Sequence, residues 1–410
     1  MLSQVLSELR LLTLALVAGL AACAGQPQSS MPSMPSLPPV NNMQPNRLNI
    51  PLPPPRKGFA GSGKFAPMAM LPSTQRPPAA RWQFPFKPNP FTKPVCASDP
   101  CSPKLDRNSD KIVTHLQTTT CAGVPCGFSL GFISVCQPGT DCPGEDGTWP
   151  TYYPSATDPQ YQITCTYKSS CSVPANLQIP DGAVASGSDD HHAIVIVMTS
   201  RTTGSQYNFF KFPTVAVHGG GPLTVASVSS CTISSFAGTG TCTSGGNAAG
   251  LPEQGALLDP REILAGSINH VLSGPMNCPS PNHVWPAHSS DGVCPGGIKQ
   301  GQRVWLDLTD AQIDALPAPH AAWDKTILKA LHHYGMVAND SMQNNPNAPW
   351  SFSGFDNMTL TLGGGQPAWP AFFTEVQNEC PTCDMGWVNG TSHLDIPTTG
   401  ISPSNLHIVK

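Results

Sequence analysis

The cysteine pattern constrains the fold of this 410-residue chain more than any other feature. Fifteen cysteines are present, and all but the first fall into seven close pairs: Cys96 and Cys101, Cys121 and Cys126, Cys136 and Cys142, Cys165 and Cys171, Cys231 and Cys242, Cys278 and Cys294, and Cys380 and Cys383. Because short loops close easily, this spacing predicts seven disulfides between sequence neighbours. The spacing of Cys380 and Cys383 also fits a redox or zinc pair.

The remaining cysteine, Cys23, ends a segment with the pattern of an export signal. The apolar run 11–22 is too short for a membrane-spanning helix, which needs about 20 residues, but it suits a signal peptide. Residues 20–23 (LAAC) resemble a bacterial lipobox, and Ala24 resembles the next residue of lipoproteins sorted to an outer membrane. The resemblance implies cleavage before Cys23 and acylation of Cys23, which makes the lipid bilayer a predicted partner. Exported chains also meet the oxidising conditions that disulfides need.

Composition gives a first division of the chain. Only 11% of residues are charged, against about 25% in average domains, and the net charge of -4 argues against a nucleic-acid partner. Twenty of the 46 prolines lie between residues 25 and 103, a composition typical of a disordered tether. Five segments are therefore predicted: a signal peptide (1–22), a lipidated Pro-rich linker (23–103), disulfide-rich loops and short strands (104–180), a β-rich core domain (181–377) and a C-terminal extension (378–410).

The rest of the sequence predicts a mainly β fold. Apolar or β-branched runs predict strands over 193–198, 207–212, 223–230, 303–308 and 372–376, and a further strand begins after Gly335. Capping residues and apolar spacing predict helices over 259–272, 309–317 and 321–334. We therefore expect a β-sandwich or jelly-roll-like domain with about three packed helices.

Several short blocks in the second half of the chain resemble those of an uncharacterised family of secreted bacterial proteins. They occur in the same order over about 155 residues and include Gly187–His192, Ala248–Pro252, Glu262–His270, Val284–Ala287 and Ala330–Asp340. The resemblance implies a β-rich exported domain and brings no established reaction. The family pattern often has Glu where this chain has Asn208, so any role of that acid is missing here.

Five polar residues of these blocks are candidates for acid and base chemistry. Asp190 and His192 lie two positions apart at a strand start, so both side chains are predicted on one face, where a carboxylate can orient an imidazole. A polar surface turn is the alternative. Glu262 is either a helix cap or an acid, and His270 is either a buried hydrogen-bonded residue or a base. These two are about 80° apart around the predicted helix and need not meet. Asp340 is either a turn former or a site carboxylate.

A loop that Cys278 and Cys294 would close contains two candidate substrate-binding residues, Trp285 and His288. Loops that are held rigid are common binding sites. The indole of Trp285 either stacks on a sugar face or fills the core. The Asp189–His192 run contains types of side chain that bind divalent ions, but it lacks a further ligand at a recognisable spacing. We therefore assign no metal site and no cofactor.

Two functions follow as hypotheses. In the first, a lipid-anchored protein of the bacterial cell envelope, exported to the outer membrane or cell surface, handles extracellular polysaccharide and cleaves glycosidic bonds by acid and base chemistry. In the second, it is a non-catalytic carbohydrate-binding or envelope-structural lipoprotein, and the same residues are caps, turns and core hydrogen bonds. The low charge and the β-rich pattern favour polysaccharide by analogy only. The sequence contains no GxSxG motif and no phosphate-binding loop, so it suggests neither a serine hydrolase nor a nucleotide-binding protein. Its sequons carry little information in a bacterial lipoprotein.

Overall fold

The computed structural model describes residues 91–410 except for 119, 122–123, 126, 137–146, 188–189, 199–203, 233–241, 244–246, 343–349, 357–367, 381–384 and 389–390. The chain divides into two units, Met1–Pro67 and Met68–Lys410, and every described residue belongs to the second. The predicted signal peptide, Cys23 and most of the linker lie outside the described residues. Within the described residues no helix is both long and apolar enough to cross a membrane.

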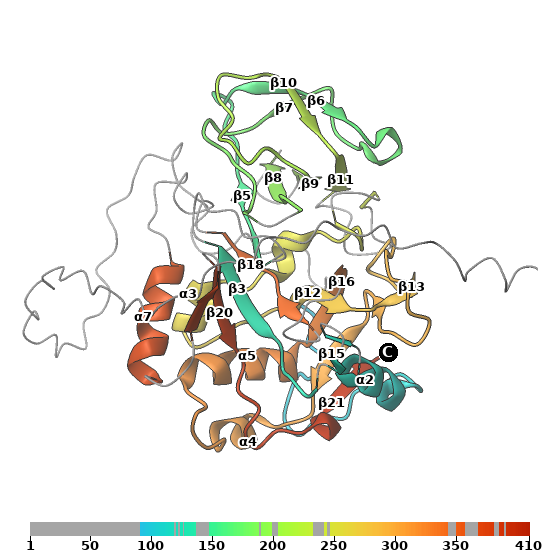
Figure 1. Cartoon of the computed structure of the whole chain (residues 1–410), viewed down its shortest axis with the longest axis vertical. Coiled ribbons are helices and arrows are strands. Elements are labelled where there is room, and N and C mark those ends of the chain that lie inside the picture. The colour runs from blue at the N-terminus through green and yellow to red at the C-terminus, as the bar shows by residue number, and fades with distance from the viewer. Residues whose placement is uncertain are drawn as a thin grey trace, which may run out of the picture. The chain divides into compact units, whose positions relative to one another are not determined.

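The fold is mainly β, as predicted, with several small sheets and five α-helices among the described residues, three of them seven or more residues long (Figure 1). One four-stranded sheet has the order β12 (Leu272–Asn277), β16 (Met336–Met342), β15 (Arg303–Leu306) and β21 (Leu406–Val409). Helix α5 (Ala322–His333) packs against it, and Ile327 and Leu331 of this helix share a buried cluster with Val304 and Ile408. The predicted helix 321–334 and the strands at 303 and 336 are therefore confirmed.

The largest apolar cluster also contains a second four-stranded sheet. This sheet has the order β17 (Ser351–Phe352), β3 (Phe132–Cys136), β20 (Thr391–Asp395) and β19 (Met385–Val388). Helix α7 (Trp369–Glu379) contributes Trp369, Phe372 and Val376 to the same cluster. The predicted strand 372–376 is therefore wrong. Spacing of four between apolar residues fits a helix as well as an alternating strand, and Pro370 in the first turn favours the helix.

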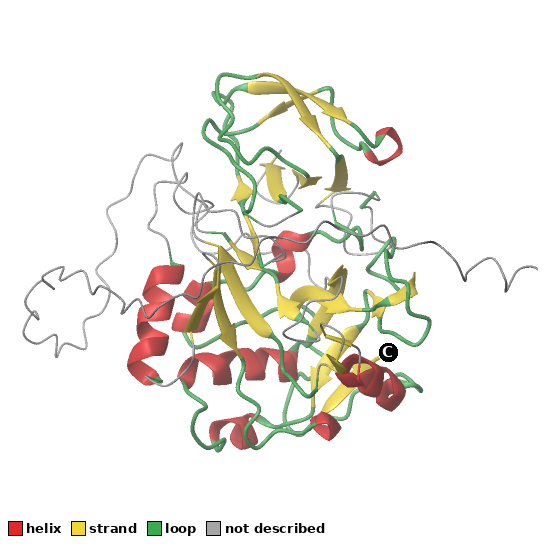
Figure 2. Ribbon diagram, viewed as in Figure 1, coloured by secondary structure: helices red, strands yellow, loops and turns green. Residues whose placement is uncertain are grey.

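Two further sheets share a separate apolar cluster. One has the order β11 (Ser227–Thr232), β9 (Gly204–Phe210), β8 (Ala193–Met198) and β5 (Thr151–Tyr152), and the other has the order β10 (Gly221–Val225), β6 (Gln160–Cys165) and β7 (Asn176–Gln178). Strand β8 has the predicted bounds, 193–198. The predicted strand 223–230 is two strands that belong to different sheets and are separated at Ala226. In Figure 2 the α-helices gather around the first two sheets rather than around these.

Short elements complete the described part of the chain. Three two-stranded sheets pair β1 (Thr120–Cys121) with β2 (Val124–Pro125), β4 (Thr148–Trp149) with β18 (Gly354–Phe355), and β13 (Ser280–His283) with β14 (Lys299–Gln300). Helix α4 (Asp310–Asp314) confirms the predicted capping box at Thr309. Single 3-10 turns lie at Lys168–Ser170, Glu253–Ala256 and Pro403–Asn405.

Two helix predictions and part of the linker need correction. Helix α3 (Pro260–Leu264) is much shorter than the predicted 259–272, because Gly266 adopts a left-handed φ of 75° that ends the helix. Helix α2 (Ser109–Thr118) lies where only loops and short strands were predicted. Residues 91–103 were assigned to the linker, yet Phe91 is buried and its carbonyl accepts a hydrogen bond from the Val271 amide at 2.8 Å.

Four of the seven predicted disulfides are present: Cys96–Cys101, Cys165–Cys171, Cys231–Cys242 and Cys278–Cys294. Cys380 is also disulfide-bonded, so its thiolate is not a zinc ligand in this state, and a redox role of the Cys380 and Cys383 pair stays a prediction. Cys126, Cys142 and Cys383 lie outside the described residues, so the three pairings that involve them stay predictions.

Candidate functional site

Asp190 and His192 lie in a turn just before β8, which begins at Ala193, so the predicted strand-face placement is wrong although the two side chains do meet. Nε2 of His192 is 3.9 Å from Oδ2 of Asp190, whose other oxygen is 3.7 Å from Nζ of Lys211. The His192 ring is only 2% exposed and stacks on Trp149, with ring centroids 3.9 Å apart and planes at 11°. His192 therefore packs as a core aromatic residue, a position that a sugar chain cannot reach.

Glu262 and His270 also meet, although the predicted helix did not require them to. Because α3 ends early, the chain turns back and places Nε2 of His270 3.1 Å from Oε2 of Glu262. Nδ1 of His270 lies 2.5 Å from the carbonyl oxygen of Val271, and the ring is 1% exposed. Both ring nitrogens therefore face oxygen acceptors. A base needs a nitrogen that can accept a proton from substrate, so this geometry favours the structural interpretation.

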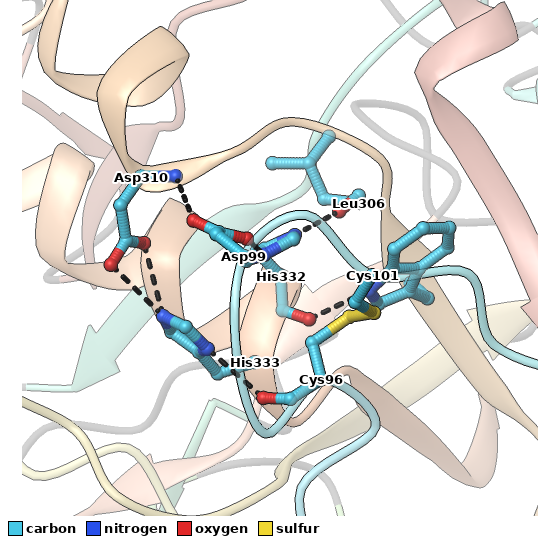
Figure 3. The surroundings of a disulfide bond; sticks show 8 residues. Cys96, Asp99, Cys101, Leu306, Asp310, His332 and His333 are labelled. Atoms are coloured by element: carbon cyan, nitrogen blue, oxygen red, sulfur yellow. Dashed lines mark hydrogen bonds and ion pairs between the residues drawn. A yellow bond between two sulfur atoms is a disulfide. The ribbon is translucent and has the colours of Figure 1, made fainter.

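The same arrangement recurs at three histidines that the sequence analysis did not single out. Figure 3 shows two of them beside the Cys96–Cys101 disulfide. His332 lies 3.1 Å from the Leu306 carbonyl and 2.5 Å from the Asp99 carboxylate, and His333 lies 3.2 Å from the Cys96 carbonyl and 3.0 Å from the Asp310 carboxylate. His320 likewise joins the Thr399 carbonyl, at 2.8 Å, to the Asp324 carboxylate.

These histidines hold together segments that are far apart in the sequence. His332 and Asp99 are separated by 233 positions. Burial raises the pKa of Asp99, but the Asp310 amide and the His332 ring donate to its carboxylate and together bring the pKa below its ordinary value. Local sequence carries no signal for such distant partners, so these contacts cannot be predicted from it.

A cavity of ≈ 420 Å³ lies beside His333. Three of its titratable groups are already paired within the protein: His333 and Asp310 with each other, and Lys329 with Asp314 at 2.8 Å. Because these groups are paired with each other or with Asp314, they leave no unpaired charge in the cavity to select a ligand. Its walls come mainly from the segment that contains Cys96, the turn after α3 and helix α5. The lining residues include Cys96, Ala97, Gly266, Ser267, Ile268, Asn269, Asp310, Thr326, Lys329 and Tyr334.

The 278–294 loop, which the Cys278–Cys294 disulfide closes, exposes apolar side chains at the surface. Trp285 is 49% exposed and Val293 is 78% exposed, and His288 is also exposed. Five other tryptophans among the described residues are at most 3% exposed: Trp149, Trp305, Trp323, Trp350 and Trp369. Trp285 therefore does not fill the core, and its stacking on a sugar stays a prediction.

Backbone hydrogen bonds and a close approach fix the conformation of this loop. The Val284 amide donates to the Gln300 carbonyl at 2.9 Å, and the His288 amide donates to the Ala249 carbonyl at 2.8 Å. At Gly301, whose φ is 90°, a Cβ would lie only 2.0 Å from the Val284 carbonyl oxygen. The loop thus packs on its neighbours so closely that Gly301 cannot carry a side chain without a shift of the backbone.

The loop also lies next to Asp340, which was predicted as an acid or a turn former. Oδ2 of Asp340 accepts a hydrogen bond from the Ala248 amide at 3.3 Å, and the Ala248 carbonyl accepts one from Oγ of Ser289 at 2.6 Å. Asp291, which the sequence analysis missed, accepts hydrogen bonds from Gln300, at 2.6 Å, and from Ser341. Asp340 and Asp291 therefore support the loop that presents Trp285 and His288.

The predicted residues thus form three groups with different neighbours: Asp190 with His192, Glu262 with His270, and Asp340 with the 278–294 loop. The last group includes the half-exposed indole of Trp285. A rigidly held, half-exposed indole can bind the apolar face of a sugar ring or another flat apolar group. No family model, curated protein or solved structure matches this chain.

Proposed function

We propose that this protein is an exported, lipid-anchored protein of the bacterial cell envelope that binds extracellular polysaccharide through the 278–294 loop. The observation that carries the proposal is the exposure of Trp285 on a loop that a disulfide and several backbone hydrogen bonds hold in one conformation. An aromatic ring that is already ordered loses little conformational freedom on binding, which favours affinity. His288, exposed on the same loop, can donate or accept hydrogen bonds at the edge of a bound sugar.

The state of the candidate acids and bases favours binding over cleavage. Glycoside hydrolysis needs two carboxyl groups about 5–10 Å apart on either side of the scissile bond. Glu262 pairs with the buried His270, Asp340 accepts the Ala248 amide, and Asp190 lies beside Lys211 and the buried His192. These contacts support a structural role for the three carboxylates, and we therefore propose the non-catalytic alternative.

Export and lipid anchoring rest on the lipobox-like residues 20–23 and on the disulfides. Disulfides persist in oxidising compartments, and four are present among the described residues. A lipid anchor would place the polysaccharide-binding loop outside the cytosol, where such polymers occur.

A polysaccharide-binding assay with Trp285→Ala tests the proposal. Affinity electrophoresis against a panel of bacterial and plant polysaccharides should identify at least one ligand, and Trp285→Ala should weaken its binding about tenfold, as expected when a stacking contact of about 1–1.5 kcal/mol is lost. Tyr167→Ala is the matched control, because Tyr167 is an exposed aromatic residue outside the loop. Equal binding by wild type and Trp285→Ala would contradict the proposal, as would binding to none of the polysaccharides.

The cleavage alternative is tested on the same ligand. An increase in reducing ends that is abolished by Asp190→Asn or Glu262→Gln would show that the protein is an enzyme. We expect no such increase.

A further inference from the structure

The imidazole of His115 lies at the base of the 278–294 loop. Helix α2 carries His115 in its last turn, and Nε2 lies 3.3 Å from the Cys278 carbonyl oxygen. Nδ1 lies 3.6 Å from the position that a Cβ on Gly296 would occupy. The ring therefore contacts the loop at Cys278, one of the two cysteines that close it.

One ligand atom from each of His115, Cys278 and Cys294 lies within 4.8 Å of the other two. No other His, Cys, Asp or Glu residues in the described part of the chain form such a group of three. In a tetrahedral zinc site, bonds of about 2.3 Å to sulfur and about 2.1 Å to nitrogen place neighbouring ligand atoms roughly 3.5 Å apart. The three side chains therefore need only small adjustments to reach a common metal ion once the bond between the sulfurs is open.

All three residues are partly buried and partly exposed to solvent. Two thiolates and one imidazole form a donor set that zinc accepts with its fourth position open. Thiolate ligands also select zinc over the hard cations calcium and magnesium, which prefer oxygen.

We propose that His115, Cys278 and Cys294 form a three-ligand site for a thiolate-preferring metal ion when the Cys278–Cys294 disulfide is reduced. A thiol reductant supplies two electrons and two protons, so the bond between the sulfurs breaks, two thiols form and the reductant becomes a disulfide. Zinc then displaces the two thiol protons, which go to solvent, and forms two bonds to sulfur and one to nitrogen. The 278–294 loop can therefore be closed either by a disulfide or by a metal ion.

Alkylation of the reduced protein tests this proposal. The full chain is treated under native conditions with a water-soluble phosphine. The phosphine takes an oxygen atom from water and becomes a phosphine oxide, while the two protons of that water go to the sulfurs and the disulfide becomes two thiols. The phosphine is removed, zinc chloride is added, and mass spectrometry follows the alkylation of each cysteine. Zinc should slow the alkylation of Cys278 and Cys294 about tenfold or more. His115→Ala should abolish this protection, and His283→Ala, in the same loop but outside the group of three, should retain it.

Two further measurements separate loss of the site from loss of the fold. Far-UV circular dichroism checks the fold of each variant, and His115→Gln provides a second variant that keeps a polar side chain but lacks the imidazole ligand. Cobalt in place of zinc should give thiolate-to-metal charge-transfer absorption in the wild type and lose it in His115→Gln. The proposal is overturned by equal protection in wild type and His115→Ala, by no protection in wild type, or by Cys278 and Cys294 staying oxidised until the fold is lost.

Discussion

Glu253 is a fully buried carboxyl group in a network of polar side chains. It accepts hydrogen bonds from Oγ of Ser273 at 2.8 Å, from Nδ2 of Asn247 at 3.1 Å and from Nδ2 of Asn339. Burial raises the pKa of Glu253 from 4.5 to about 7, although the hydrogen bonds from Asn339 and Ser273 oppose this shift. No role for this residue was predicted from the sequence, because its partners are brought together only by the fold.

The raised pKa makes folding stability depend on pH in a definite direction. Between pH 4.5 and about 7 the folded protein holds a proton on Glu253 that the unfolded chain releases, so the free energy of unfolding falls as the pH rises through this window. At about 1.4 kcal/mol per pKa unit, the full loss is about 3 kcal/mol. Glu253→Gln, which cannot ionise, should remove this part of the decrease.

Urea unfolding at pH 5 and pH 8 measures this effect. The difference in unfolding free energy between the two pH values should be smaller in Glu253→Gln than in wild type, and unchanged in the exposed control Glu375→Gln. The assignment to Glu253 is refuted if Glu253→Gln and wild type lose the same stability between pH 5 and pH 8.

At the scale of elements, the close packing of the 278–294 loop predicts different outcomes at two glycines. Gly301 and Gly266 both have positive φ, so alanine at either position costs about 1–2 kcal/mol of backbone strain. A Cβ at Gly301 would also meet the Val284 carbonyl at 2.0 Å, whereas one at Gly266 would have nothing within 4 Å. Gly301→Ala should therefore lower the free energy of unfolding by about 1–3 kcal/mol more than Gly266→Ala.

Thermal or urea unfolding of the two variants checks this difference. Gly301→Ala should also weaken polysaccharide binding, because the displaced carbonyl belongs to the residue before Trp285. If the two variants unfold alike and bind alike, Gly301 does not hold the loop in place.

Local capping and apolar spacing identified some elements and failed at others for physical reasons. Thr309 and the apolar face of 321–334 predicted α4 and α5 because the signals lie within each helix. Helix α2 was missed, although Ile112 and Leu116 have helical spacing, because the surrounding cysteines suggested loops.

For the candidate site, cysteine spacing correctly predicted the closed loop around Trp285 and His288. The contact between Asp340 and Ala248 could not be predicted, because 92 positions separate them.

At the scale of the whole molecule, the proposed anchor gives a prediction about Cys23. Radiolabelled palmitate should enter the wild-type protein, because two or three acyl chains are needed for stable attachment to a bilayer. Cys23→Ser should lose the label and leave the membrane fraction, whereas the Cys96→Ser/Cys101→Ser double variant should keep both. A wild-type protein without label, in a soluble fraction, would exclude the lipid anchor.

The strands that pair in the sheets come from distant parts of the sequence. Strand β3 pairs with both β17 and β20, which are more than 200 positions further along, and Leu105 forms a bridge with Val409. The sheets therefore join residues of the predicted segments 104–180, 181–377 and 378–410. A sandwich or jelly-roll arrangement of these small sheets stays a prediction.

The difference in span between disulfides and strand pairs has a consequence for how fast the protein folds. The four described disulfides join residues 5, 6, 11 and 16 positions apart, and loops of such lengths form within microseconds or less. Folding rates instead fall as the average sequence separation of contacting residues increases. The disulfides therefore scarcely reduce the number of conformations that the unfolded chain samples before β3, β17 and β20 pair. When the disulfides stay intact, assembly of that sheet should therefore set the pace of refolding.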